Sequence, residues 1–192
     1  MNIQKSLPPT FRSHYRLFLR TASAAVLHHS QAKRNLRERW RPMFDAGAQV
    51  THELQDRPDD ASPEWIRARE RWLRDWNKRL DGTLKLLYTS ARSRGLPHKV
   101  TRNLGFMIMY ERDRIIGKLH RLPKWDSSAQ RKRTAVAPKE LKAIRKKQEE
   151  EQSHNNANKA LDEVIRMAEA FSGLTLGRNQ VIIRKWPSHR RT

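Results

Sequence analysis

The 192-residue chain contains no cysteine. This absence excludes a disulfide framework, thiolate zinc sites, thiol catalysis and thiolate ligation of an iron–sulfur cluster. The sequence also lacks an apolar run of the roughly 18–20 residues that a membrane-spanning helix needs, which predicts a soluble or peripheral protein. It has no phosphate-binding glycine loop, G-x-S-x-G elbow, H-E-x-x-H motif or dinucleotide fingerprint, so we expect no enzymatic activity.

Acidic residues are few relative to basic ones. The chain has 41 Lys and Arg against 20 Asp and Glu, a formal net charge of +21. Such an excess implies a polyanionic partner, which charge alone leaves open between RNA, an acidic protein and a membrane surface. Because 36% of the residues are hydrophobic and 32% are charged, one helical domain with polar extensions fits better than two complete cores.

The first 37 residues contain no Asp or Glu, whereas basic residues, Ser and Thr are interspersed among them. This composition is typical of a mitochondrial targeting segment. Because the same residues carry a helical pattern, we expect an uncleaved internal signal and a location in the mitochondrial matrix. The alternative is an acid-free stretch that occurs by chance in a very basic chain.

Apolar residues that recur every three or four positions predict a three-helix bundle over about residues 11–28, 31–45 and 63–94. We expect Thr10 to cap the first helix, and Pro42 to bend or end the second, whose pattern fades at Gly47. For the third, Ser62 and Pro63 supply a cap and a first helical residue, with Gly95 as the C-cap.

A fourth helix is expected after Gly95-Leu96-Pro97, which completes a domain of residues 1–121. Residues 122–138 are predicted to be a basic linker. Residues 139–192 are predicted to be a charged helix, continuous or broken near residues 153–158, and a basic tail with a small hairpin around residues 177–179. The predicted fold class is therefore all-α with a basic, partly helical C-terminal extension.

Two smaller groups of residues have structural interpretations. Trp65, Trp72 and Trp76 are expected to pack against the first two helices, although an exposed member would be able to stack on RNA bases. The His28-His29 pair is expected to mark a helix end, and no metal site is expected there.

The first two predicted helices contain an ordered set of residues: Tyr15-Arg16, Leu19-Arg20, Leu36-Arg37 and Trp40-Arg41. The set resembles the mitochondrial LYR superfamily, whose pattern is Leu-Tyr-Arg, a Leu-Arg pair one turn on, and a later arginine before an aromatic–arginine pair. This chain departs from the pattern with His14 at the leucine position and Trp40 at the usual phenylalanine position. The stretch from Thr83 to Leu104 resembles an uncharacterised fungal group of LYR-like proteins, which extends the resemblance over about the first 105 residues.

The resemblance implies a three-helix LYR fold that acts as a non-enzymatic adaptor or assembly factor. Members commonly bind the mitochondrial acyl carrier protein, whose acidic helix docks on basic residues while its acyl-phosphopantetheine enters between the helices. They serve respiratory complexes, iron–sulfur machinery or mitochondrial ribosomes as assembly factors or accessory subunits. The docking residues expected for the carrier protein or a client complex are Tyr15, Arg16, Arg20, Arg37, Trp40 and Arg41.

Each of these residues also has a simpler interpretation. Tyr15 and Trp40 lie at helical spacing and suit core packing, which can coexist with docking if the core contains the acyl channel. The four arginines suit a solvated helix face.

The basic extensions favour a second hypothesis, a mitochondrial ribosome component or assembly factor that binds rRNA or ribosomal proteins. Lys and Arg supply phosphate contacts and a tryptophan supplies base stacking. The candidate RNA-binding residues are Arg131, Lys132, Arg133, Lys146, Lys147, Arg184, Lys185, Trp186, Arg190 and Arg191. The alternative is a basic tail without a specific function. The two functional hypotheses overlap, since such tails would tether an LYR-type domain to ribosomal RNA.

Overall fold

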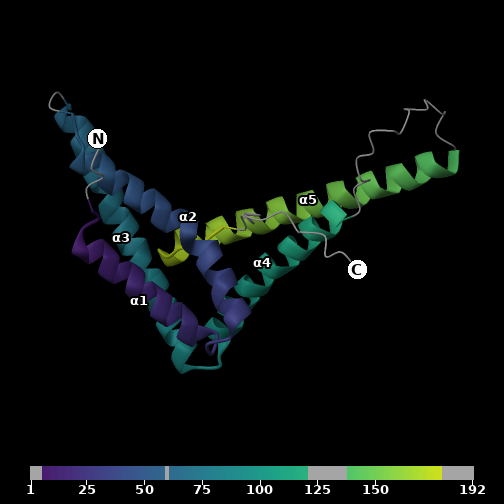
Figure 1. Cartoon of the computed structure of the whole chain (residues 1–192), viewed down its shortest axis with the longest axis horizontal. Coiled ribbons are helices and arrows are strands. Elements are labelled where there is room, and N and C mark those ends of the chain that lie inside the picture. Colours follow the sequence, from purple (N-terminus) through teal and green to yellow (C-terminus); the bar gives the residue numbers. More distant parts are fainter. Residues whose placement is uncertain (1–5, 59–60, 121–137, 179–192) are drawn as a thin grey trace, which may run out of the picture.

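The computed structural model describes residues 6–58, 61–120 and 138–178. These residues form five helices, α1 (Pro9–Ala25), α2 (Ser30–Gln55), α3 (Pro63–Arg92), α4 (Leu96–His120) and α5 (Pro138–Ser172). α1, α2 and α3 pack together, and α4 packs against α2 and α3 (Figure 1). The all-α prediction is confirmed for the described residues, which contain no strand. None of their helices is long and apolar enough to cross a membrane.

An aromatic cluster of Phe11, Phe18, Trp40, Phe44 and Trp76 joins the first three helices. The Phe18 ring lies 5.8 Å from the Trp40 ring and 4.9 Å from the Phe44 ring, measured between centroids. Trp76 of α3 meets Phe44 edge-on at 5.8 Å and stacks on Phe11 at 5.3 Å. Each favourable ring pair contributes about 0.5–1.5 kcal/mol beyond the burial of its area. The cluster therefore attaches α1, α2 and α3 to one another within a core that also contains aliphatic side chains of all three helices.

α2 continues to Gln55, well past its expected end at residue 45, so this boundary prediction is wrong. Pro42 lies inside the helix, and Figure 1 shows α2 changing direction about midway, as expected where proline removes a backbone N–H. Gly47 also lies inside the helix, where its missing side chain makes room for Trp76: a Cβ at Gly47 would lie 2.7 Å from that ring. The glycine therefore serves packing between α2 and α3 and does not mark a helix end.

The predicted start of α3 is confirmed and its predicted cap at the other end is wrong. The Ser62 hydroxyl accepts the Trp65 amide at 3.2 Å, and Pro63 is the first helical residue. At the other end Ser93, in an extended conformation, occupies the cap position instead of Gly95.

The ends of α1 also differ from the expected 11–28. The helix begins at Pro9, so Thr10 lies inside it and does not cap it. It ends at Ala25 because Leu27 and His28 adopt positive φ angles of 56° and 59°. His29 then caps α2, since its Nδ1 accepts the Ala32 amide at 3.3 Å. The histidine pair thus marks a helix boundary, and no metal-binding group of three or more His, Cys, Asp or Glu occurs among the described residues.

The predicted fourth helix is present as α4 and is fixed to α2 by a polar contact. Asn35 is only 2% exposed, and its amide donates to the Gly105 carbonyl at 3.0 Å. The Asn35 Oδ1 accepts from Arg112 at 2.9 Å and from Gln31 at 3.0 Å. Arg112 also pairs with Glu38. Both polar atoms of the Asn35 side chain are therefore hydrogen-bonded, and the bonds to Gly105 and Arg112 set the register of α4 on α2.

α5 is one continuous helix, so no break occurs near residues 153–158. The side chains of residues 141–153 are all exposed, and Figure 1 shows this half of α5 projecting beyond the bundle. α5 meets α4 through the Lys118–Glu151 ion pair and through His154, whose Nε2 lies 3.4 Å from a Glu111 carboxylate oxygen.

Gly173 follows α5 with a φ of 61°, which confirms the predicted stop. Residues 175–178 have no regular structure, so the described part of the expected hairpin contains no strand. The remainder of that segment, and the expected linker apart from Pro138, lie outside the described residues.

Replacing Gly47 with Ala is expected to destabilise the protein by about 1–3 kcal/mol, because the new methyl group displaces the Trp76 ring from a packed core. The matched control is Gly117→Ala in α4, where a Cβ meets nothing within 4 Å. The free energy of unfolding of this control variant is expected to rise by about 0.5–1 kcal/mol, because alanine has a better helix propensity than glycine. Urea unfolding measures both changes, and equal effects would contradict the assigned role of Gly47.

Candidate functional site

The outer face of α1 carries a row of arginines. Arg16 and Arg20 are exposed one turn apart and, at about 100° per residue, lie opposite the buried Phe18. Arg12 extends the row by another turn. α1 contains no acidic residue, and none of the three arginines forms an ion pair with a described residue. The predicted docking pair therefore faces solvent, on the side of α1 opposite the core.

Arg37 and Arg41 form a second exposed pair, one turn apart on α2. Arg41 Nε lies 3.5 Å from Asp45 Oδ2, and both side chains are at least half exposed, at 50% and 68%. Exposed ion pairs contribute only about 0–1 kcal/mol, so Asp45 offsets the charge of Arg41 in part.

The two aromatic residues of the predicted docking set lie at different depths. Tyr15 is 39% exposed, and its ring meets Phe44 at 4.9 Å, which places it at the edge of the core. Trp40 is fully buried, and its indole N–H donates to the Thr175 carbonyl at 2.9 Å. Tyr15 is thus accessible to a partner, whereas Trp40 is enclosed by the rest of the chain.

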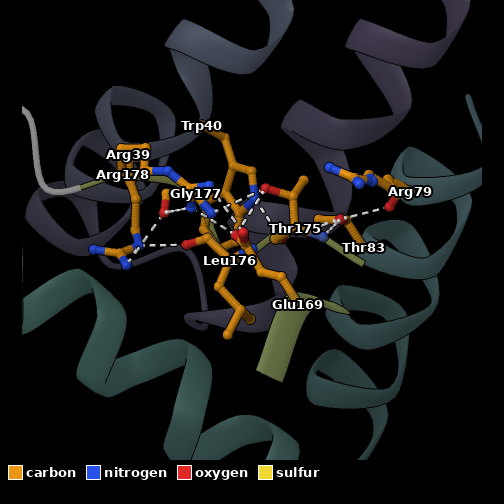
Figure 2. A network of polar contacts seen from close by, with 9 residues as sticks. All are labelled: Arg39, Trp40, Arg79, Thr83, Glu169, Thr175, Leu176, Gly177 and Arg178. Carbon is orange, nitrogen blue, oxygen red and sulfur yellow. Dashed lines mark hydrogen bonds and ion pairs between the residues drawn. The ribbon is translucent and has the colours of Figure 1, made fainter. Parts of the chain in front are cut away.

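Residues 173–178, named here the C-terminal clip, bond to both α2 and α3 (Figure 2). The Thr83 hydroxyl of α3 accepts the Thr175 amide at 3.0 Å and lies 3.1 Å from the Thr175 carbonyl oxygen. Gly82 allows the approach, since a Cβ there would lie 2.8 Å from the Gly173 carbonyl oxygen. The clip therefore anchors the end of α5 to the bundle.

Arg39 is the buried cation of this network, with 0% exposure. Its Nε donates to the Leu176 carbonyl, and its Nη2 lies 3.5 Å from the Gly177 carbonyl oxygen. Burial, followed by repulsion from Arg178, lowers the pKa of Arg39 to about 10, so the guanidinium stays charged at neutral pH. Sequence reasoning missed Arg39. Its position three residues after Leu36, inside the apolar stripe, was the available signal.

Glu169, at 8% exposure, is the buried carboxylate of this network and pairs with Arg178. Its carboxylate accepts the Leu176 amide at 2.7 Å, the Thr175 hydroxyl at 3.1 Å, and two Arg178 N–H groups at 2.8 and 2.9 Å. Burial is the largest single effect and acts to raise the pKa of Glu169. The hydrogen bonds from Arg178, Leu176 and Thr175 together outweigh it, so this pKa lies below its ordinary value.

A pocket of about 470 Å³ lies between α4 and α5. Its lining residues are Met107, Tyr110, Glu111, Arg114, His154, Asn158, Leu161 and Asp162. Glu111 accepts hydrogen bonds from Arg114, which are the main cause of its lowered pKa, and it also pairs with His154. Because these charged groups already satisfy one another, we interpret them as a tie between the helices.

The predicted RNA-binding residues lie mostly outside the described part of the chain. Lys146 and Lys147 are exposed on the projecting half of α5, and Lys146 Nζ lies 4.0 Å from a Glu150 carboxylate oxygen. The predicted residues outside the described part are Arg131, Lys132, Arg133, Arg184, Lys185, Trp186, Arg190 and Arg191.

The described fold defines an α-helical protein whose first four helices share a core and whose fifth helix is attached by a clip. Comparison with protein-family models, curated proteins and solved structures finds no match for the chain.

Replacing Thr83 with Val is expected to loosen the C-terminal clip, because the Thr175 amide loses its acceptor while the side-chain shape is kept. A lost buried hydrogen bond corresponds to about 1–3 kcal/mol of local stability. Hydrogen exchange of residues 174–178 should therefore accelerate. The matched control is Thr89→Val on the same helix, whose exposed hydroxyl bonds only to the Lys85 carbonyl. Equal exchange in the two variants would show that Thr83 does not hold the clip.

Replacing Glu169 with Gln tests the charge at the clip. Since folding lowers the pKa of Glu169 from its ordinary 4.5, its carboxylate stabilises the fold fully above that pH, and less as the pH falls through the folded-state value. The difference in unfolding free energy between wild type and E169Q should be about 1–3 kcal/mol at neutral pH and shrink below pH 4.5.

Urea unfolding at a series of pH values measures this difference. The control is Glu163→Gln, an exposed residue of the same helix. A difference between wild type and E169Q that does not change with pH would refute the role given to the Glu169 carboxylate.

Proposed function

We propose that this chain is a non-enzymatic mitochondrial adaptor or assembly factor of the LYR type. In this proposal the exposed arginines of α1 and α2 dock the acidic helix of an acyl carrier protein in the matrix, and the bundle presents it to a client complex. The single observation that carries the proposal is the acid-free outer face of α1, where Arg16 and Arg20 stand one turn apart without a carboxylate partner among the described residues.

Charge and geometry support docking from outside the bundle. Successive members of the α1 row are separated by one turn, a rise of about 6 Å, so an acidic helix laid along α1 can meet them in succession. Arginine also presents several donors in a planar fork, which suits bidentate pairing with carboxylates. Tyr15 adds a partly exposed ring beside this row.

The interior sets a condition on the acyl group of the carrier protein. Phe18, Leu36 and Trp40 are fully buried between the helices, so an acyl chain enters by displacing rings of the aromatic cluster. Each buried methylene contributes about 0.8 kcal/mol, and the displaced rings oppose this gain. The difference in binding free energy between acylated and unacylated carrier protein should therefore be smaller than burial of the acyl chain alone would give.

A second candidate function is binding to mitochondrial ribosomal RNA through the basic extensions. The observation that favours it is the projecting half of α5, which holds Lys146 and Lys147 away from the bundle with all neighbouring side chains exposed. In this proposal the chain is a ribosome component or assembly factor.

The double substitution Arg16→Glu and Arg20→Glu is expected to weaken capture of an acyl carrier protein by about tenfold or more, which corresponds to about 1.4 kcal/mol. Attraction is replaced by repulsion at two exposed positions, so helicity by circular dichroism should be unchanged. Binding is measured by titration with both acylated and unacylated carrier protein at low and moderate salt.

The control for this experiment is Arg67→Glu with Arg71→Glu, an equally spaced exposed pair on α3. It changes the net charge by the same amount and should leave carrier binding near the wild-type value. If both double variants weaken capture equally, the effect comes from overall charge and the docking role of the α1 arginines is lost.

A further inference from the structure

The outer surface of α3 presents a row of cations that we name the α3 ridge. Its members are Arg67, Arg71, Arg74, Lys78, Lys85 and Arg92, all exposed. Successive members are three, four or seven residues apart. They lie on the side of α3 opposite the buried Trp76 and Leu80. At a rise of 1.5 Å per residue the ridge is about 37 Å long.

The ridge carries more positive than negative charge, and none of its six cations is held in an ion pair with a described residue. Exposed acidic side chains also lie beside the ridge within one turn of its members, including Glu70, Asp75 and Asp81. Arg69, which lies off the ridge, is the α3 arginine that pairs with another helix, through Glu53 at 2.8 Å.

An exposed aromatic side chain lies at one end of the ridge. Tyr88 is 56% exposed, and the Arg92 guanidinium lies over its ring at 5.6 Å from the centroid. An aromatic face beside a row of cations is the combination that binds single-stranded nucleic acid: cations follow the phosphates and a ring stacks on an unpaired base. The Arg92 guanidinium adds a second planar group for the same base.

From this geometry we propose that the α3 ridge is a binding site for single-stranded nucleic acid, with the phosphodiester backbone along Arg67 to Lys85 and a base on Tyr88. The site is independent of the proposed adaptor role, because it lies on the solvent face of α3 and includes no residue of α1 or α2. It is also separate from the basic extensions considered above.

A membrane surface fits the ridge less well. Helices that bind in the membrane interface need an apolar face to insert below the headgroups. The other exposed side chains beside the ridge cations include Glu70, Asp81 and Thr89, which are polar, and the single aromatic ring of Tyr88. The ridge therefore offers charge for a phosphate backbone and, apart from the Tyr88 ring, no apolar surface for acyl chains.

The test compares two full-length variants that each lose four exposed cations. The ridge variant carries Gln at Arg67, Arg71, Arg74 and Lys78, and the control variant carries Gln at Lys99, Arg102, Lys159 and Arg166, which are exposed and lie outside both proposed binding surfaces. Gln keeps helix propensity close to that of Arg and Lys, so both variants should fold as wild type does by circular dichroism. The probes are a 20-nucleotide oligouridine RNA, the same sequence as DNA, a duplex RNA, and vesicles containing phosphatidylserine.

The salt dependence of single-strand binding gives the number of phosphate contacts, since the slope of log K against log salt is about −0.7 per contact for single strands. The ridge variant should lose about 3 units of slope and at least about tenfold in affinity, whereas the control variant should change much less. Equal losses in the two variants, an unchanged slope in the ridge variant, or a ridge-dependent preference for duplex or vesicles would each overturn the proposal.

A second measurement tests the stacking position. Crosslinking to 4-thiouridine RNA should occur at Tyr88, and Tyr88→Ala should lower single-strand affinity by about fivefold or more. Tyr88→Phe should bind the single strand with the wild-type affinity, because phenylalanine keeps the ring that stacks on a base. Loss in both Tyr88 variants would rule out base stacking at this position.

Discussion

Packing of the aromatic cluster fixes the rotation of α1, α2 and α3 about their own axes. Once Phe18, Phe44 and Trp76 point inward, the 100° step of each helix decides which side chains point outward. Arg16 and Arg20 then lie opposite Phe18, and the α3 ridge lies opposite Trp76. The cationic faces are thus a consequence of where the rings are buried, and both candidate binding surfaces depend on the same core.

Local signals in the sequence predicted the elements that depend on neighbouring residues. The start of α3 follows from Ser62 and Pro63, and the stop of α5 follows from Gly173, because caps and positive φ angles are decided within a few residues. The length of α2 was not predictable in this way. Pro42 and Gly47 are helix-breaking signals, and the Trp76 ring that explains the glycine comes from another helix.

The residues of the candidate site also divide into those that local periodicity places and those that depend on contacts with distant residues. Periodicity was sufficient to place Arg16 and Arg20 on an exposed helix face, because exposure there needs no knowledge of other elements. It did not reveal that Trp40 is covered by Thr175 or that Arg39 is buried beneath Leu176. These contacts join residues more than 130 positions apart and run through backbone carbonyls, which every residue type carries. Such pairing leaves no mark in side-chain patterns.

Five of the 20 acidic residues connect separate elements of the fold. The inter-element or clip pairs are Glu38 with Arg112, Glu53 with Arg69, Glu111 with His154, Glu151 with Lys118, and Glu169 with Arg178. The chain has 20 acidic against 41 basic residues, and α1 contains no carboxylate that could screen its outer face. The resulting self-repulsion opposes folding. A polyanion that binds the folded chain relieves it and stabilises that chain by mass action, so partner binding and stability are coupled through the same charge.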